Sequence, residues 1–334
     1  MELKRNVSLK SYNTFGIDAA AEYFTEINDI KKLEEITALP QQKHILGGGS
    51  NILLTKGVKG LVIHNKLKGI TVEKEDNNHV WIRVQAGEIW HDFVLHVINK
   101  GWGGIENLSL IPGTVGASPI QNIGAYGVEA RETIESVTFW YWNEKTFLTY
   151  NNRECEFGYR DSIFKQLLRD KIFLTSVVFK LDKNPVYNTS YGAIEEELDN
   201  MGVQELSVKA IAYAVIHIRT SKLPDPNVTG NAGSFFKNPV IPIQHFNLLQ
   251  SRYPRIPYYK VNEALIKVPA GWLIEQCGWK GYKSGEAGVH AKQALVLVNY
   301  GHAKGSEIWK LSDEILASVK KKFGIELERE VQMW

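Results

Sequence analysis

Cysteine is scarce in this chain of 334 residues, which carries only Cys155 and Cys277. The two are far apart and form no C-x-x-C pair, so a disulfide framework is excluded and we expect buried free thiols in a reducing compartment. No uninterrupted run of about eighteen apolar residues occurs, and the N-terminal segment lacks an apolar stretch of signal-peptide length. The sequence therefore predicts a soluble, cytoplasmic protein.

The chain also lacks runs of one charge. Its 39 basic and 37 acidic residues leave a net charge of +2, so we expect neither nucleic acid nor a membrane as a partner. Its nine histidines show no spacing typical of metal ligands, and we expect no metal. We expect a monomer that binds small molecules.

Two strongly amphipathic helices are evident from the apolar period. The first follows Gly87 and ends before Gly101, and the second covers about residues 306–323 before Gly324; a third is expected over about 207–222. Their expected buried faces are Trp90, Phe93, Val94, Val97 and Ile98 for the first, and Ile308, Leu311, Ile315, Leu316, Val319 and Phe323 for the second.

Apolar bursts between turns predict strands. They are "HVWIRVQAG", "HILGGG", "GLVIHN", "KIFLTSVVFKL" and "ALVLVNY". Helices and strands do not alternate regularly as in repeated βαβ units, so the sequence favours an α+β fold. The segment "KLPDPNVTGNAG", residues 222–233, is rich in proline, glycine, asparagine and aspartate, and predicts a domain junction.

Two glycine-rich segments with little charge point to a ligand. In "HILGGGSNILL" three consecutive glycines let backbone amides converge on an anion such as a phosphate, although the segment is neither a P-loop nor G-x-G-x-x-G. Residues 108–129, "LSLIPGTVGASPIQNIGAYGVE", hold four glycines and two prolines. Because buried backbone must be paired, the two segments suit a large cofactor with a pyrophosphate and a polar heterocycle. The alternatives are a tight turn and a structural crossover that pairs its own backbone.

Three short stretches carry candidate chemical groups. In "FGYRDSIFK", Arg160 lies among apolar neighbours and needs an anionic partner, which is either Asp161 or a substrate carboxylate. Ser234 follows a glycine turn in "GNAGSFFKNP", which is not a hydrolase elbow because Phe236 replaces the last glycine. Glu330, in "LEREV", is either functional or an ordinary surface carboxylate.

Five segments in order resemble one family. "GGGSN", "IPGTVGASPIQNIGAYG", "GYRDS", "KLPDPNVTGNAGSFFKNP" and "VHAKQALVLVN" are similar to those of the UDP-N-acetylenolpyruvoylglucosamine reductases, flavoenzymes of peptidoglycan precursor synthesis. The resemblance runs from about Tyr12 to Glu330. It implies a two-lobed FAD-binding domain of the vanillyl-alcohol-oxidase (PCMH) type over 1–222, with lobes of about 1–67 and 68–222, and a C-terminal α/β substrate-binding domain over 223–334.

The resemblance also implies the reaction. NADPH would reduce non-covalently bound FAD, which would reduce UDP-N-acetylglucosamine enolpyruvate to UDP-N-acetylmuramate. A hydride would pass from reduced FAD to C3 of the enolpyruvyl group and a proton from Ser234 to C2. Arg160 and Glu330 would stabilise the negative charge that builds on the carboxylate.

Further roles carry over position by position. The residues matched to FAD are Gly47, Gly48, Gly49, Ser50, Asn51, Ile111, Pro112, Gly113, Thr114, Ala117, Ser118, Gly124 and Gly127. Those matched to the substrate are Tyr126, Arg160, Tyr191, Lys222, Asn238 and Gln293. Tyr191, with the long segment 183–202, indicates the subtype with a mobile tyrosine loop. Gln332 departs from the family, which often has arginine there.

Two other functions remain open at this point. One is a flavin oxidase of the same fold that acts on a sugar or alcohol; such enzymes commonly bind flavin covalently through histidine or cysteine, and the glycine loops contain no histidine. The other is a nucleotide-sugar-binding protein without catalysis.

Overall fold

The computed structural model describes residues 2–334, and they form two compact units. Unit 1 consists of residues up to Val7, Ala21–Gly48 and Lys59–Ser221. Unit 2 consists of Ser8–Ala20, Gly49–Val58 and Lys222–Trp334. Each unit is therefore assembled from three separate stretches of the chain.

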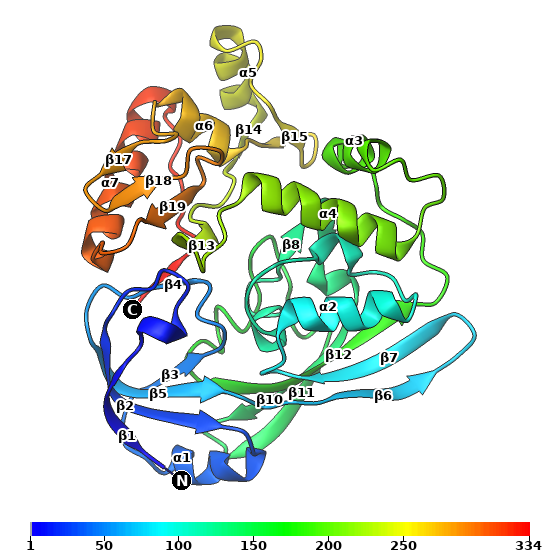
Figure 1. The fold of residues 1–334 in the computed structure, drawn as a ribbon, viewed down its shortest axis with the longest axis vertical. Coiled ribbons are helices and arrows are strands. Elements are labelled where there is room, and N and C mark those ends of the chain that lie inside the picture. Colours follow the sequence, from blue (N-terminus) through cyan, green and yellow to red (C-terminus); the bar gives the residue numbers. More distant parts are fainter. Residues whose placement is uncertain (1) are drawn as a thin grey trace. The chain divides into compact units, whose positions relative to one another are not determined.

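Unit 1 contains a small sheet with a short helix beside it (Figure 1). Its strands lie in the order β1 (Lys4–Ser8), β2 (Ala20–Ile27), β5 (Val58–Asn65) and β3 (Lys43–Leu46), and the helix is α1 (Leu33–Thr37). β3 and β5 run parallel. Leu33 and Ile36 of α1 pack with Ile63 of β5, against Trp140 and Phe173 from a larger sheet.

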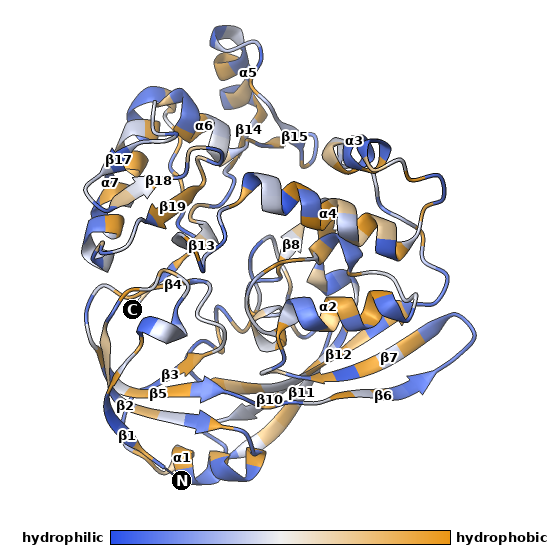
Figure 2. Cartoon of the chain, viewed as in Figure 1, coloured by the Kyte–Doolittle hydropathy of each residue, from blue (hydrophilic) through white to orange (hydrophobic). Residues whose placement is uncertain are grey.

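That larger sheet has five antiparallel strands. In spatial order they are β11 (Thr146–Asn151), β10 (Ile134–Tyr141), β12 (Ile172–Asp182), β7 (His79–Gln85) and β6 (Ile70–Glu75). β12 lies in the middle, and all its residues but Lys180 and Asp182 are buried because both faces of the sheet are covered. β7 alternates between buried and half-buried positions, which appears in Figure 2 as alternating hydrophobic and hydrophilic residues.

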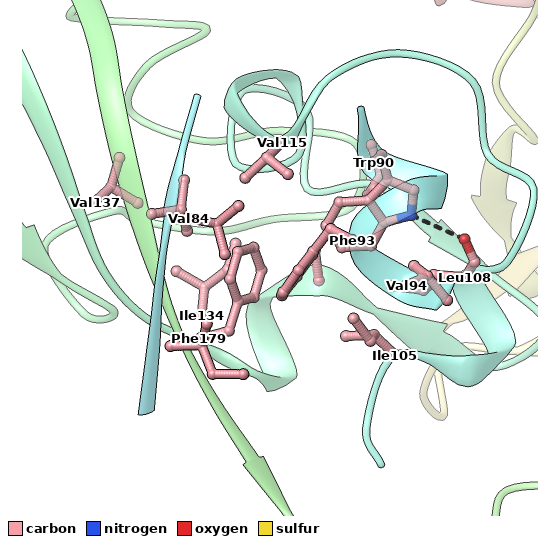
Figure 3. Packing of buried hydrophobic residues seen from close by; sticks show 14 of the residues in the cluster. Val84, Trp90, Phe93, Val94, Ile105, Leu108, Val115, Ile134, Val137 and Phe179 are labelled. Atoms are coloured by element: carbon pink, nitrogen blue, oxygen red, sulfur yellow. Dashed lines mark hydrogen bonds between the residues drawn. The ribbon is translucent and has the colours of Figure 1, made fainter. Parts of the chain in front are cut away.

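Helix α2 (Trp90–Asn99) covers one face of this sheet. Its five predicted core residues are all buried, so that prediction is confirmed. Figure 3 shows Trp90 and Phe93 against Phe179 of β12, with ring centroids 5.8 and 4.9 Å from the Phe179 ring. The Trp90 indole Nε1–H donates to the Leu108 carbonyl at 2.9 Å, which ties the helix to the following coil.

That coil, residues 105–132, contains little regular structure. It holds short 3₁₀ turns at Glu106–Leu108, Val115–Ala117 and Ala130–Glu132, and the two-residue strands β8 (Gly124–Ala125) and β9 (Val128–Glu129). Further along, α3 (Gly192–Asn200) packs on α4 (Val208–Lys222) through Ile194, Leu198, Ile211, Val215 and Ile218.

Unit 2 combines three small sheets with three helices. The main sheet has the order β13 (Gly230–Ser234), β19 (Val296–Asn299), β18 (Ala287–Val289) and β17 (Lys283–Ser284). The second consists of β14 (Val240–Pro242), β16 (Leu265–Lys267) and β15 (Tyr259–Lys260), and the third pairs β20 (Gln332–Met333) with β4 (Ile52–Leu53). The helices are α5 (Ile243–Arg252), α6 (Ala270–Gln276) and α7 (Gly305–Phe323).

The three predicted helices and the five predicted strands are all present, and the α+β class is confirmed. Leu316 is only partly buried, and the small Ser312 is buried on α7 instead. Both cysteines are free, but the expectation that both are buried is wrong for Cys277, which is partly exposed. Within residues 2–334, no helix combines the length and apolarity needed to cross a bilayer.

Candidate functional site

The two glycine-rich segments meet within unit 1. A Cβ on Gly47 would lie 2.6 Å from Thr114 Oγ1, and one on Gly48 would lie 2.9 Å from the Cα of Gly113. Backbone of one segment thus contacts backbone of the other, at a separation that a side chain would prevent. The geometry brings together four residues that the sequence assigns to a cofactor, in a surface of main-chain atoms with little charge.

Part of the second segment pairs its own backbone. The amides of Val115 and Gly116 donate to the carbonyls of Glu88 and Ala86, at 2.8 and 2.9 Å. The buried Ser118 hydroxyl donates to the Val115 carbonyl at 2.7 Å. For residues 115–118, the alternative of a structural crossover that pairs its own backbone therefore explains the hydrogen bonding. Of the remaining predicted cofactor residues here, Ala117 and Pro112 are exposed and Ile111 is partly buried.

Hydrogen bonds attach the "GYRDS" segment to this coil. Ser162 Oγ donates to the Ile120 carbonyl at 2.6 Å, Asn122 Nδ2 donates to the Gly158 carbonyl at 2.9 Å, and Arg160 Nη2 donates to the Gly124 carbonyl. The predicted catalytic arginine consequently lies on the predicted cofactor loop.

Arg160 itself has a left-handed backbone, with φ of +54°. Its guanidinium also donates to the Asn122 carbonyl at 3.4 Å and lies 5.5 Å from the centre of the Tyr159 ring. The neighbouring Asp161 carboxylate bonds to Gln166 Nε2 and the Ser162 amide, each at 3.0 Å, and not to Arg160. The alternative in which Asp161 neutralises Arg160 is not found.

Tyr126 and Tyr191, both assigned to the substrate, contact each other in unit 1. Their ring centroids are 5.4 Å apart and the rings are nearly perpendicular. Burial raises the pKa of the Tyr126 hydroxyl, and the nearby Arg219 opposes that shift. Tyr191 is 38% exposed and immediately precedes α3. Gly127 accepts a hydrogen bond at its carbonyl from Asn188, in the loop that leads to Tyr191.

In unit 2, Ser234 lies at a strand irregularity. β13 pairs with β19 through Asn231–Val298 and Ser234–Val296, and the register shifts between them. Gly233 takes a φ of +68° in this bulge, and its amide donates to Asn231 Oδ1 at 2.9 Å. Bulges of this kind redirect side chains, and the Ser234 side chain is exposed.

Glu330 lies next to this bulge. Its amide donates to the carbonyl of Phe235 at 2.9 Å, and Phe236 forms a bridge with Arg329. Asn51 Nδ2 donates to the Glu330 carbonyl at 3.3 Å, and the Asn51 carbonyl accepts from the Gln332 amide. Unit 2 therefore brings together the predicted proton donor, the predicted catalytic carboxylate and the end of the first glycine segment.

The other predicted residues of unit 2 lie apart along the chain. Asn238 Oδ1 accepts from the amide of Ala270, the first residue of α6, at 2.9 Å. Gln293 Oε1 approaches the next residue, Gly271, so Asn238 and Gln293 meet at the first turn of this helix. Lys222 is exposed at the end of α4. Of the predicted cofactor residues in unit 2, the Gly49 carbonyl accepts a hydrogen bond from the Thr14 amide, and Ser50 is partly buried before β4.

Sequence reasoning missed the asparagines that organise these coils. The buried Asn122 side chain forms hydrogen bonds with the Gly158 carbonyl, the Glu129 carboxylate and the Arg131 amide. The buried Asn231 side chain bonds to the Thr229 carbonyl and the Gly233 amide and so fixes the turn before Ser234. Each stands directly beside residues of the quoted glycine motifs, and that position was the signal available. Asn107, which donates to the Tyr126 carbonyl, has no such signal.

Chemically, unit 1 supplies a main-chain cradle and a guanidinium, and unit 2 supplies a hydroxyl and a carboxylate. Among residues 2–334 no group of three His, Cys, Asp or Glu side chains is placed to hold a metal ion.

Comparison with known proteins assigns both parts of the chain. Residues 23–148 match the family model of an FAD binding domain, and residues 225–334 match that of the UDP-N-acetylenolpyruvoylglucosamine reductase C-terminal domain. The glycine cradle fits the first match, because a close main-chain surface is what a dinucleotide pyrophosphate requires.

Full-length relatives agree with these matches. The UDP-N-acetylenolpyruvoylglucosamine reductase of Flavobacterium johnsoniae is 50% identical and covers 100% of both chains; that of Amoebophilus asiaticus is 49% identical, over 100% of this chain and 99% of its own. The crystal structure of the Thermus caldophilus reductase (MurB) superposes with a TM-score of 0.70 at 25% identity, covering 100% of this chain and 99% of that one. The FAD-binding fold with a reductase C-terminal domain is thus confirmed, and the chain belongs to the UDP-N-acetylenolpyruvoylglucosamine reductase (MurB) family.

Proposed function

We propose that this protein reduces UDP-N-acetylglucosamine enolpyruvate to UDP-N-acetylmuramate with NADPH, in peptidoglycan precursor synthesis. The observation that carries the proposal is the backbone pairing of 235–236 with 329–330, which brings the segment of Ser234 to that of Glu330 in the part that matches the reductase C-terminal domain. A hydroxyl and a carboxylate on neighbouring segments suit protonation of a carbon beside a carboxylate-stabilised negative charge.

FAD is the cofactor of the domain that residues 23–148 match, and when bound it supplies the hydride chemistry that NADPH renews. Gly47, Gly48, Gly113 and Thr114 would hold it through main-chain atoms, and Gly49, Ser50 and Asn51 continue the first segment. The assigned set also includes Ile111, Pro112, Ala117, Ser118, Gly124 and Gly127. Ser118 would shape the coil that holds FAD and would not bond to FAD through its hydroxyl, because that hydroxyl donates to the Val115 carbonyl.

Arg160 would hold the enolpyruvyl carboxylate. Its guanidinium is anchored on the carbonyls of Asn122 and Gly124, so its orientation is set before the substrate arrives. A fixed cation of this kind stabilises charge that develops during reaction and costs no reorganisation at that moment. Glu330 would assist at the same carboxylate.

Ser234 would donate the proton to C2. A neutral hydroxyl is a weak acid, so the bulge at Gly233 matters because it fixes the direction of the side chain. The alkoxide that remains needs a nearby donor or water.

Tyr126, Tyr191, Lys222, Asn238 and Gln293 would contact the sugar, diphosphate and uracil of the substrate. We assign residues 1–222 to the FAD-binding domain, in lobes of about 1–67 and 68–222, and 223–334 to the substrate-binding domain. The protein would act as a cytoplasmic monomer without nucleic acid or membrane partners.

The direct test follows the visible flavin absorbance of the purified protein. NADPH should bleach it under anaerobic conditions, and UDP-N-acetylglucosamine enolpyruvate should restore it with formation of UDP-N-acetylmuramate. A colourless protein that takes up no FAD would refute the proposal. Bleaching of the flavin by a simple sugar followed by its reoxidation by oxygen, and yellow colour that stays in the heat-precipitated pellet, would indicate the covalent flavin oxidase instead.

A further inference from the structure

Arg329 directly precedes Glu330 and has no role in the proposed reaction. Only 18% of its side chain is exposed, and a guanidinium is rarely buried to this extent unless it is paired. Its Nε donates to Ser312 Oγ at 2.8 Å, its Nη2 donates to the Asp313 carboxylate, and its Cζ lies 4.0 Å from the centre of the Trp309 ring. All three partners belong to α7, so the Arg329 side chain is bound to that helix.

The face of α7 that receives Arg329 contains a buried serine. Trp309, Ser312 and Asp313 are three and four residues apart, and residues at this spacing are neighbours on a helix surface. Ser312 is fully buried on the apolar side of the helix. Its hydroxyl donates to the Trp309 carbonyl at 2.6 Å and accepts from Arg329. An apolar residue in its place would leave the guanidinium without a buried acceptor, so the serine is matched to Arg329.

Backbone hydrogen bonds hold the same segment from its other side. The Glu330 amide donates to the Phe235 carbonyl, and the Glu328 carbonyl accepts from the Lys237 amide, each at 2.9 Å. These two bonds lie on either side of Arg329, which forms an antiparallel bridge with the chain after β13. In such a pair the chain is extended, and successive side chains leave it on opposite faces.

We propose that Arg329 is a positioning residue: bound to α7, it fixes the face of the chain from which the adjacent Glu330 carboxylate projects. This inference rests on the proposed function, because that function gives the Glu330 carboxylate its role. The backbone bonds by themselves let the segment twist about its own axis. A side chain held by a charge-assisted hydrogen bond, a buried hydroxyl and an aromatic ring resists that twist, and the alternation of side chains passes the constraint to Glu330.

Positioning through Arg329 predicts that only one half of the reaction changes. Arg329→Met keeps an unbranched side chain against the Trp309 ring and removes the hydrogen bonds to α7. At saturating substrate it should slow oxidation of the reduced flavin about tenfold, because a displaced Glu330 no longer assists at the substrate carboxylate. The Kd of FAD, the rate of flavin reduction by NADPH and the KM for the substrate should stay within about twofold. Arg329→Lys, which keeps a donor without the planar fork, should fall in between.

Two further variants test the route of this effect. Asp313→Ala removes a partner of the guanidinium on α7 and should slow the same step, to a smaller extent. In a double-mutant cycle, Arg329→Met added to Glu330→Ala should cause no further slowing, since the carboxylate that Arg329 positions is already absent. Lys320→Met is the matched control: it breaks an exposed ion pair between α7 and Glu326 in the same C-terminal segment, and it should leave all rates unchanged.

Stopped-flow absorbance of the flavin measures both half-reactions in each variant. Wild-type rates in Arg329→Met, or effects that add fully to those of Glu330→Ala, would overturn the inference. Equal slowing of the two half-reactions would show that Arg329 supports the fold and not Glu330. If thermal melts show that Arg329→Met does not fold, Arg329→Lys and Asp313→Ala decide by the same two rates. Failure of the wild-type protein to turn over the substrate, or a normal rate in Glu330→Ala, would instead refute the proposed function.

Discussion

Buried asparagine side chains order the irregular segments of this protein. Asn13 bonds to the carbonyls of Leu9 and Ile17 and to the Ile17 amide, while Asn122 and Asn231 fix the coils beside Arg160 and Ser234. A primary amide offers two donors and an acceptor, so it replaces backbone pairing where helix and sheet are absent. The candidate catalytic groups owe their positions to such bonds.

The role proposed for Ser234 separates the two halves of the reaction. Ser234→Ala should slow oxidation of the reduced flavin by substrate by about 10²–10⁴-fold, while NADPH reduces the flavin at a nearly normal rate, because only the second half needs the proton. Stopped-flow absorbance of the flavin measures both rates. Ser251→Ala, an exposed serine, serves as the control. Equal slowing of the two halves would remove Ser234 from the role of proton donor.

Cys155 predicts a pH dependence of stability. Burial raises the pKa of its thiol to about 12, whereas the unfolded chain ionises at an ordinary thiol pKa. The native state then holds a proton that the unfolded state releases, so stability is complete below pH about 9 and falls between about 9 and 12 by a few kcal/mol. Urea midpoints at pH 7 and 10 should differ less in Cys155→Ala than in the wild type. An identical difference in both proteins would contradict this prediction.

At the scale of elements, the proposed cofactor cradle is two coils in backbone contact and not a helix or sheet. The close approach of Gly48 to Gly113 has no tolerance for a Cβ, because the obstructing atom is main chain. Helix α2 is bonded to the second coil, because the Trp90 amide donates a hydrogen bond to the Gly113 carbonyl at 3.0 Å. A change in either coil must therefore displace the other or the helix.

Gly48→Ala should weaken FAD binding by about 10–100-fold, since separating the coils costs roughly 1–3 kcal/mol. Fluorescence titration of the apoprotein with FAD measures the effect. The control is Gly192→Ala, because a Cβ there meets open space and the backbone is not left-handed. Equal affinities for the two variants would show that the contact between the coils is not part of the cofactor site.

At the scale of the whole molecule, the residues predicted for the site fall in both units. Unit 1 contains Arg160 and most of the residues assigned to FAD, and unit 2 contains Ser234, Glu330 and the rest. The short stretches Ser8–Ala20 and Gly49–Val58 join unit 2 although their neighbours in sequence belong to unit 1. The chain therefore enters unit 2 three times, and a simple cut of the sequence does not separate the units.

FAD should stabilise the whole protein by mass action. At a free concentration about 100 times its Kd, the gain is about 2.7 kcal/mol. FMN, which lacks the adenylate and the pyrophosphate linkage, should raise the Tm of the apoprotein much less if the glycine cradle holds the pyrophosphate as proposed. Thermal melts with FAD, FMN and riboflavin test this. Equal shifts with FMN and FAD would argue against the cradle as the pyrophosphate site.

The sequence by itself determined three helices, five strands and the identity of the family, whereas helices such as α3, α5 and α6 were not predicted. The apolar faces of α2 and α7 follow from a period that belongs to the sequence, and the strands are apolar bursts between turn residues. The glycine, arginine and serine motifs and their order identified the family, because each motif is a short continuous stretch of sequence. Leu316 was misassigned because burial at the edge of a helix face depends on what packs there.

Tertiary structure alone decided which distant main chains touch. Two of these contacts join residues far apart in sequence: Gly47–Gly48 with Gly113–Thr114, and Glu330 with Phe235, the neighbour of Ser234. A third is a choice between nearby partners, because Asp161 bonds to Gln166 and not to Arg160. No local pattern encodes them, because hydrogen bonds of coils are chosen by the packing around them.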